Sequence, residues 1–149
     1  MNFRCLYLYN LLMRSILLSL LLIGSASGTT ITGLKLPEGQ KTKLEAYRID
    51  GEYYIKSSSL AKFLEGEETI DFFDKTGGID FGDFDIEYSL FSSFIKCGEN
   101  IYNIYKPVQF RDGSFILPVR YLSDILNRVS PDDFIWDGET LIVSPPVYN

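Results

Sequence analysis

The amino-acid sequence predicts an α+β domain in which short, mostly antiparallel strands curl around two short helices. Three observations support this prediction. Beyond residue 40, short apolar and aromatic runs alternate with turn-forming pairs such as Asp-Gly. Two of these runs are followed by the i, i+3, i+4 apolar spacing of a short amphipathic helix. Finally, residues 50–64 recur in degenerate form as residues 112–126.

The two copies of this internal repeat predict the same local structure. Each begins with Asp-Gly, which favours a tight turn because Gly adopts positive φ freely and Asp tolerates it. Each continues as a short strand and then as a helix. A serine of residues 57–59 can cap the first helix, and Pro118 suits the first position of the second. Their apolar stripes are Leu60, Phe63 and Leu64 in the first copy, and Leu122, Ile125 and Leu126 in the second.

The rest of the chain is predicted to form further strands. Residues 84–88 alternate apolar and acidic side chains, which indicates a strand with one buried and one solvated face. Hairpins are predicted over residues 92–105 and 108–117, and a last one over residues 134–143. The total is about eight to ten short strands and two short helices.

The first 28 residues predict a secretory signal peptide, and with it an exported protein. They contain no Asp or Glu, an apolar run over residues 15–23 and small residues at 24–28. The apolar run is too short to span a bilayer core of about 30 Å. We therefore expect no stable membrane span after cleavage. An uncleaved amphiphilic anchor is the alternative, and either Met1 or Met13 can be the true start.

The composition excludes several classes of chemistry. The chain contains no His, which rules out a Ser-His-Asp triad, a Cys-His dyad and an imidazole metal site. A net charge of −6 and a pI of about 4.6 argue against a nucleic-acid partner. Cys5 leaves with the leader, so Cys97 is expected to be either buried and inert or available for intermolecular pairing. We expect no metal and no cofactor.

The second half of the chain resembles a known family. Residues 108–126, together with residues 134–137 and 140–143, are similar to the copper amine oxidase N-terminal-like domain. Pro118 and Arg120 match that family's Pro-x-Arg element, and Trp136 and Asp137 match its Trp-Asp element. The resemblance implies a sheet curled around a helix, in a non-catalytic module found on exported bacterial proteins. The oxidase's copper and quinone chemistry lies in a different domain.

The expected organisation of the chain follows from the leader, the repeat and this resemblance. Residues 1–28 form the signal peptide, and residues 29–40, rich in Thr, Gly and Pro, form an extended N-terminal segment. Residues 41–149 form a single copper amine oxidase N-terminal-like domain. Its halves are residues 41–84, which match the family only as a degenerate copy, and residues 92–144, which match better.

Each family-motif residue has a functional and a structural interpretation. Arg120 either faces a ligand at the start of its helix or pairs with a nearby carboxylate such as Asp124, four residues on. Trp136 either offers a stacking platform to a sugar or packs on the helix stripe beside Phe134. We expect Pro118, Arg120, Trp136 and Asp137 to be structural.

Two larger groups are further candidates. The acidic residues Asp80, Asp83, Asp85 and Glu87 either bind Ca²⁺ or form a solvated strand face, and they lack EF-hand spacing. An excess of tyrosines either forms an exposed patch that contacts glycan or protein, or reflects ordinary strand propensity. These tyrosines are Tyr47, Tyr53, Tyr54, Tyr88, Tyr102, Tyr105 and Tyr121.

These observations lead to a ranked set of functional hypotheses. The first is an exported, non-enzymatic binding or stalk module of the bacterial cell envelope, which contacts cell-wall glycan or an envelope protein. It is expected in the periplasm, on the cell wall or in the secreted fraction. The alternative is a structural module whose exposed strand edges pair with another chain. A carboxylate-only glycan hydrolase is the remaining possibility, and it requires two acidic groups facing each other in a cleft.

Overall fold

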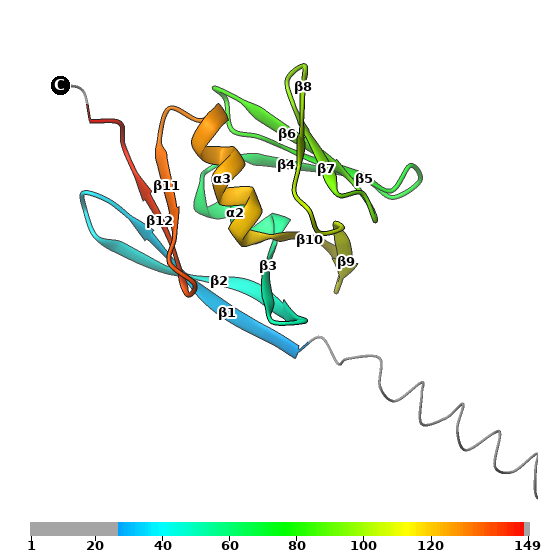
Figure 1. Ribbon diagram of the computed structural model, residues 1–149, viewed down its shortest axis with the longest axis horizontal. Coiled ribbons are helices and arrows are strands. Elements are labelled where there is room, and N and C mark those ends of the chain that lie inside the picture. Colours follow the sequence, from blue (N-terminus) through cyan, green and yellow to red (C-terminus); the bar gives the residue numbers. More distant parts are fainter. Residues whose placement is uncertain (1–26, 148–149) are drawn as a thin grey trace, which may run out of the picture.

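The computed structural model describes residues 27–147, which form two β-sheets and two helices (Figure 1). The predicted signal peptide lies almost entirely outside the described residues. The α+β fold class with mostly antiparallel strands is confirmed. The twelve described strands exceed the eight to ten expected.

The larger sheet has seven strands, and β1 is its third. In spatial order the strands are β11 (Asp133–Trp136), β12 (Thr140–Ser144), β1 (Ser27–Lys35), β2 (Gln40–Ile49), β3 (Glu52–Lys56), β10 (Ser114–Pro118) and β9 (Gln109–Arg111). The pair β1–β12 is parallel, and the other neighbours in this sheet are antiparallel. Most of the segment expected to be an extended entry, residues 29–40, is therefore an interior strand of the sheet.

The smaller sheet has five antiparallel strands in sequence order. They are β4 (Glu67–Asp71), β5 (Thr76–Asp80), β6 (Asp85–Ser89), β7 (Phe94–Cys97) and β8 (Asn100–Asn103). The sequence prediction missed β4 and β5. Acidic side chains in β4 and the Gly77-Gly78 pair in β5 are depleted in strands, so local propensity gave no signal there.

Two helices lie between the sheets (Figure 1). Helix α2 (Ser57–Phe63) contacts β2, β3, β4 and β10, and helix α3 (Val119–Val129) contacts β3, β10 and β11. Lys56 is the N-cap of α2 and makes no side-chain capping bond, so the expected serine cap is not formed. Instead, the Ser57 hydroxyl hydrogen-bonds to Glu68 and lies 3.1 Å from the Ser114 hydroxyl.

The internal repeat has a simple geometric meaning. Strands β3 and β10 belong to the two copies and pair side by side, with Ile55 opposite Leu117. Tyr54 pairs with Pro118, and Lys56 pairs with Ile116. In the repeat Tyr54 corresponds to Ile116 and Lys56 to Pro118, so the correspondence converts each of these pairs into the other. The two copies are therefore related by an approximate two-fold rotation. The Asp-Gly turns of both copies have positive φ at both residues, as predicted.

The core fills the space between the sheets and around both helices. Buried side chains from both sheets and both helices form one cluster, which includes Leu44, Leu60, Ile86, Phe115 and Leu126. The predicted helix stripes are largely buried, as each helix requires a surface to cover its apolar face. Within residues 27–147, no helix has the length and apolar character needed to cross a bilayer.

Candidate functional site

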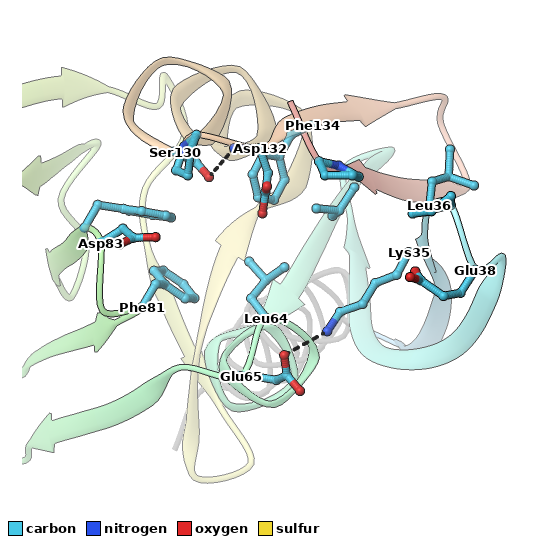
Figure 2. Close-up of a pocket in the computed structure, with 15 residues that line it drawn as sticks. Lys35, Leu36, Glu38, Leu64, Glu65, Phe81, Asp83, Ser130, Asp132 and Phe134 are labelled. Carbon is cyan, nitrogen blue, oxygen red and sulfur yellow. Dashed lines mark hydrogen bonds and ion pairs between the residues drawn. The ribbon is translucent and has the colours of Figure 1, made fainter. Parts of the chain in front are cut away.

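A cleft of about 310 Å³ opens where the C-terminal ends of both helices meet the β1–β2 and β5–β6 turns (Figure 2). Its apolar lining combines aromatic, aliphatic and proline side chains, namely Leu36, Pro37, Leu64, Phe81, Phe84, Pro131, Phe134, Val143 and Pro145. Its charged lining consists of Lys35, Glu38, Glu65, Asp83 and Asp132. The cleft is thus an apolar floor with a charged rim.

The end of α2 forms one wall of the cleft. Glu65 has a φ of 60°, and the amide of Gly66 donates to the carbonyl of Ala61 at 2.8 Å, which closes the helix in the manner of a Schellman motif. A Cβ on Gly66 would lie 2.7 Å from the Phe81 ring and 2.9 Å from the carbonyl oxygen of Asp80. Gly66 therefore lets the chain pass directly beneath Phe81, which lines the cleft.

The β5–β6 turn supplies an aromatic shelf. The amide of Phe81 donates to the carbonyl of Phe84 at 2.9 Å, and the ring centroids of the two residues are 4.7 Å apart. The Asp80 carboxylate accepts the amide of Gly82 at 2.8 Å, which fixes the turn. Asp83 sits in this turn and is held beside the shelf.

The segment after α3 forms the opposite wall. The amide of Asp132 donates to the Ser130 hydroxyl at 3.1 Å, and the amide of Phe134 donates to the side-chain carbonyl of Asn127 at 2.6 Å. These bonds hold Asp132 over the opening and keep the Phe134 ring buried beneath it. Figure 2 shows Asp132 and Asp83 around the same opening, with Leu64 and Phe81 below them in this view.

The rim of the cleft is predominantly negative. Lys35 is its single cation, and its ammonium lies 3.5 Å from the Glu65 carboxylate and 5.6 Å from the centre of the Phe63 ring. That ion pair leaves Glu38, Asp83 and Asp132 as the excess charge of the lining. Such a cleft is complementary to a ligand that combines an apolar body with a cationic group.

The four family-motif residues lie outside this cleft. Pro118 is buried and is the N-cap residue of α3, one position before the first helical position predicted for it. Asp137 accepts the amides of Glu139 and Thr140 at 2.9 and 2.7 Å in the β11–β12 turn. These backbone donors lower the pKa of Asp137. Arg120 and Trp136 line a separate hollow between α3 and β11. The structure therefore brings two of the four residues together.

Arg120 and Trp136 make only some of the contacts that their structural interpretations require. The Arg120 guanidinium lies over the Tyr121 ring, 5.7 Å from its centre, and no ion pair joins it to Asp124 in the described part of the chain. Trp136 is half-buried against the core, with its ring edge-on to Tyr53 at 5.8 Å. Packing of the indole on the core is thus only partial.

The candidate tyrosine patch is not formed. Tyr47, Tyr54 and Tyr88 are buried, and of the seven tyrosines only Tyr105 has a largely exposed side chain. The exposed aromatic surface consists mainly of phenylalanines, namely Phe72, Phe73, Phe91 and Phe94. The hydrophobicity of phenylalanine alone does not predict this exposure, because these residues lie at turns and on the outer face of a sheet.

The acidic cluster and Cys97 have simple outcomes. Asp80 and Glu87 each have a local partner, the amide of Gly82 and the ammonium of Lys96, and residues 27–147 contain no group of three side chains able to hold a metal ion.

Cys97 is buried, which confirms the first of its two interpretations. Burial raises the pKa of its thiol to about 11, so the thiol is poorly reactive at neutral pH.

Sequence reasoning did not find the cleft. Its residues come from five separate segments, and only tertiary contact between the two sheets joins them. Prolines at 37, 131 and 145 mark the ends of elements, but this local signal does not indicate that those ends converge.

Comparison with family models, with curated proteins and with solved structures found no match to this chain. The family resemblance therefore stays a prediction from the residues of the second half.

Proposed function

We propose that this chain is an exported, non-catalytic binding domain of the bacterial cell envelope, whose cleft holds a segment of an envelope protein. The signal-peptide pattern of residues 1–28 supports export. The Pro-x-Arg and Trp-Asp elements support a relationship to the copper amine oxidase N-terminal-like domain. That relationship implies a stalk or binding module rather than an enzyme.

The observation that carries the proposal is the composition of the cleft. Three prolines and five larger apolar side chains, Leu36, Leu64, Phe81, Phe84 and Phe134, form a surface that water solvates poorly. The rim adds four carboxylates and one ammonium that is already paired. An extended peptide segment with apolar side chains and at least one Lys or Arg satisfies both parts of this lining. A uniformly polar ligand would satisfy only the rim.

Two matched decapeptides test this proposal. They share alternating Phe and Pro residues and differ only in carrying Lys or Glu at the positions between them. The lysine peptide is expected to bind, with an affinity that falls as salt screens the rim, and the glutamate peptide is not. Equal affinity for both peptides would contradict the proposal.

A matched pair of variants places the interaction. Asp83→Asn combined with Asp132→Asn removes two rim charges and should weaken binding of the lysine peptide about tenfold. Asp74→Asn combined with Glu99→Gln removes two charges from exposed positions outside the cleft and should leave affinity nearly unchanged. Equal losses in the two variants would mean that overall charge, not the cleft, attracts the peptide.

A second candidate function is assembly with another chain through strand edges. One observation favours it: the edge strand β9 lies beside exposed aromatic side chains. The Phe72 ring contacts the Phe110 ring at 6.1 Å, the Phe91 amide donates to the Val108 carbonyl at 2.8 Å, and Phe73 is 94% exposed. Such a patch often marks a contact surface. A mass that rises with concentration in sedimentation analysis supports assembly, and a strict monomer at high concentration removes it.

A further inference from the structure

The Pro-x-Arg and Trp-Asp motifs meet at one hollow. Arg120 in the first turn of α3 and Trp136 at the end of β11 line a hollow of about 370 Å³, together with Ser123, Asp124 and Ile135. The packing of α3 against β11 brings these residues together from two elements. The volume falls within the range of about 300–1,000 Å³ that is usual for small-molecule sites.

The apolar part of the hollow is a supported aromatic surface. Trp136 is half-buried, and Tyr53 contacts its ring edge-on at an interplanar angle of 69°. Beside it, Ile135 is 55% exposed. A partly exposed aromatic ring is suited to packing against a flat apolar face of a ligand.

The polar part supplies one donor group and one acceptor group. Arg120 and Asp124 are both exposed and lie one turn apart on α3. The guanidinium offers N–H donors in a fixed fork, and the carboxylate accepts hydrogen bonds. The Ser123 hydroxyl is already committed, since it donates to the carbonyl of Arg120 at 2.8 Å. The two charges cancel, so the hollow favours neither a polyanion nor a polycation.

We propose that this hollow binds a sugar ring of a wall glycan. A pyranose presents an apolar C–H face that packs on an indole, and its ring hydroxyls both donate and accept hydrogen bonds. Trp136 is suited to the C–H face, Arg120 can donate to the hydroxyl oxygens, and Asp124 can accept from the hydroxyl groups. An apolar ligand would leave both charged side chains unpaired, and a charged polymer would meet one repulsive partner.

The surface continues beyond one ring. Tyr53, which supports Trp136, lies under the Arg48 guanidinium at 5.5 Å. A second aromatic ring therefore contacts Trp136, and a second cation lies over that ring. The hollow is thus expected to bind an oligosaccharide more tightly than a single sugar.

This inference goes beyond the proposed function, because it uses a different surface from the peptide-binding cleft. Together the two sites would let the domain hold a protein segment and a glycan at once. Each site has its own ligand and its own variants, so one can fail while the other stands.

The single tryptophan makes a direct test possible, because Trp136 is the only Trp in the chain. The protein, produced from the full sequence and purified after export, is titrated with chitotetraose, a β-linked tetramer of the N-acetylglucosamine found in wall glycan. A saturable change in tryptophan emission, with a matching heat of binding by calorimetry, is expected. The absence of both signals overturns the proposal.

Variants separate binding in the hollow from a general effect. Arg120→Ala and Asp124→Asn should each weaken chitotetraose binding about tenfold, as expected for loss of one charge-assisted hydrogen bond. Both residues are exposed, and unchanged urea unfolding will show that the fold is intact. Asp74→Asn, at an exposed position outside both the hollow and the cleft, should leave the sugar affinity unchanged. Equal sugar affinity in the protein and in both hollow variants also overturns the proposal.

Discussion

Two adjacent glycines in β5 give a stringent test of the packing described above. Gly77 faces the core opposite Tyr88, and Gly78 faces outward opposite Glu87. A Cβ on Gly77 would overlap the Tyr88 ring and lie 2.9 Å from the Phe115 ring. A Cβ on Gly78 would have the carbonyl oxygen of Ile86, at 3.2 Å, as its nearest neighbour, with the Thr69 and Glu87 side chains at 3.5 and 3.9 Å. Neither glycine has a positive φ, so alanine fits the backbone at both positions.

The expected free energies follow from these contacts. Overpacking a core costs about 1–3 kcal/mol, and replacing Gly by Ala in a strand returns about 0.5–1 kcal/mol of backbone entropy. Gly77→Ala should therefore lower the free energy of unfolding by about 1–2 kcal/mol. Gly78→Ala should change it by less than about 1 kcal/mol in either direction.

Urea unfolding followed by Trp136 emission measures both values. The slope of free energy against urea should stay the same in the two variants, because the surface exposed on unfolding does not change. A Gly77→Ala variant as stable as Gly78→Ala would refute the placement of β5 against Tyr88 and Phe115.

Three further predictions concern individual side chains. Burial raises the pKa of the Cys97 thiol to about 11, from an unfolded value near about 8.5. The thiol therefore stabilises the fold fully below about pH 8.5, and this stabilisation is lost as the pH rises through about 11. Cys97→Ala should reduce that alkaline loss of stability in urea titrations. Asp112 accepts the Tyr47 hydroxyl, so Asp112→Asn should cost about 1 kcal/mol more than Asp50→Asn at the matching turn of the other copy, by thermal unfolding. Backbone amides lower the pKa of Asp137, so it stabilises the fold above its unfolded pKa and loses this effect as the pH falls through the lowered value; Asp137→Asn should flatten the acid unfolding curve below about pH 4.

The repeat was the most informative part of the sequence. Asp-Gly turns, short strands and helix stripes in both copies all appear in the structure, because each is specified by neighbouring residues. The pairing of Ile55 with Leu117 was not predictable from spacing alone. A repeat states that two units are alike, but not how they face each other.

The parts that sequence reasoning missed depend on long-range contacts. Strand β1 has no sustained apolar period, yet it lies between β2 and β12 and pairs with both. The exposed positions of Phe72 and Phe73 follow from a hairpin tip whose turn is set by Asp71, which accepts the amides of Phe73 and Asp74. Their aromatic character alone suggests burial.

The candidate sites show the same division. Arg120 and Trp136 were singled out by motif, but only the packing of α3 on β11 joins them in one hollow. The cleft was not indicated at all, since its lining comes from turns at the ends of elements. Local patterns identify residues, and tertiary structure decides which of them meet.

Co-sedimentation with purified cell-wall sacculi tests the central claim most directly. The exported protein is incubated with sacculi, and both the protein retained in the pellet and the soluble wall fragments released are measured. A non-catalytic domain whose hollow binds wall glycan predicts saturable retention with no release of fragments. Absence of retention would contradict the glycan-binding role, and release of soluble fragments in proportion to incubation time would contradict a non-catalytic function.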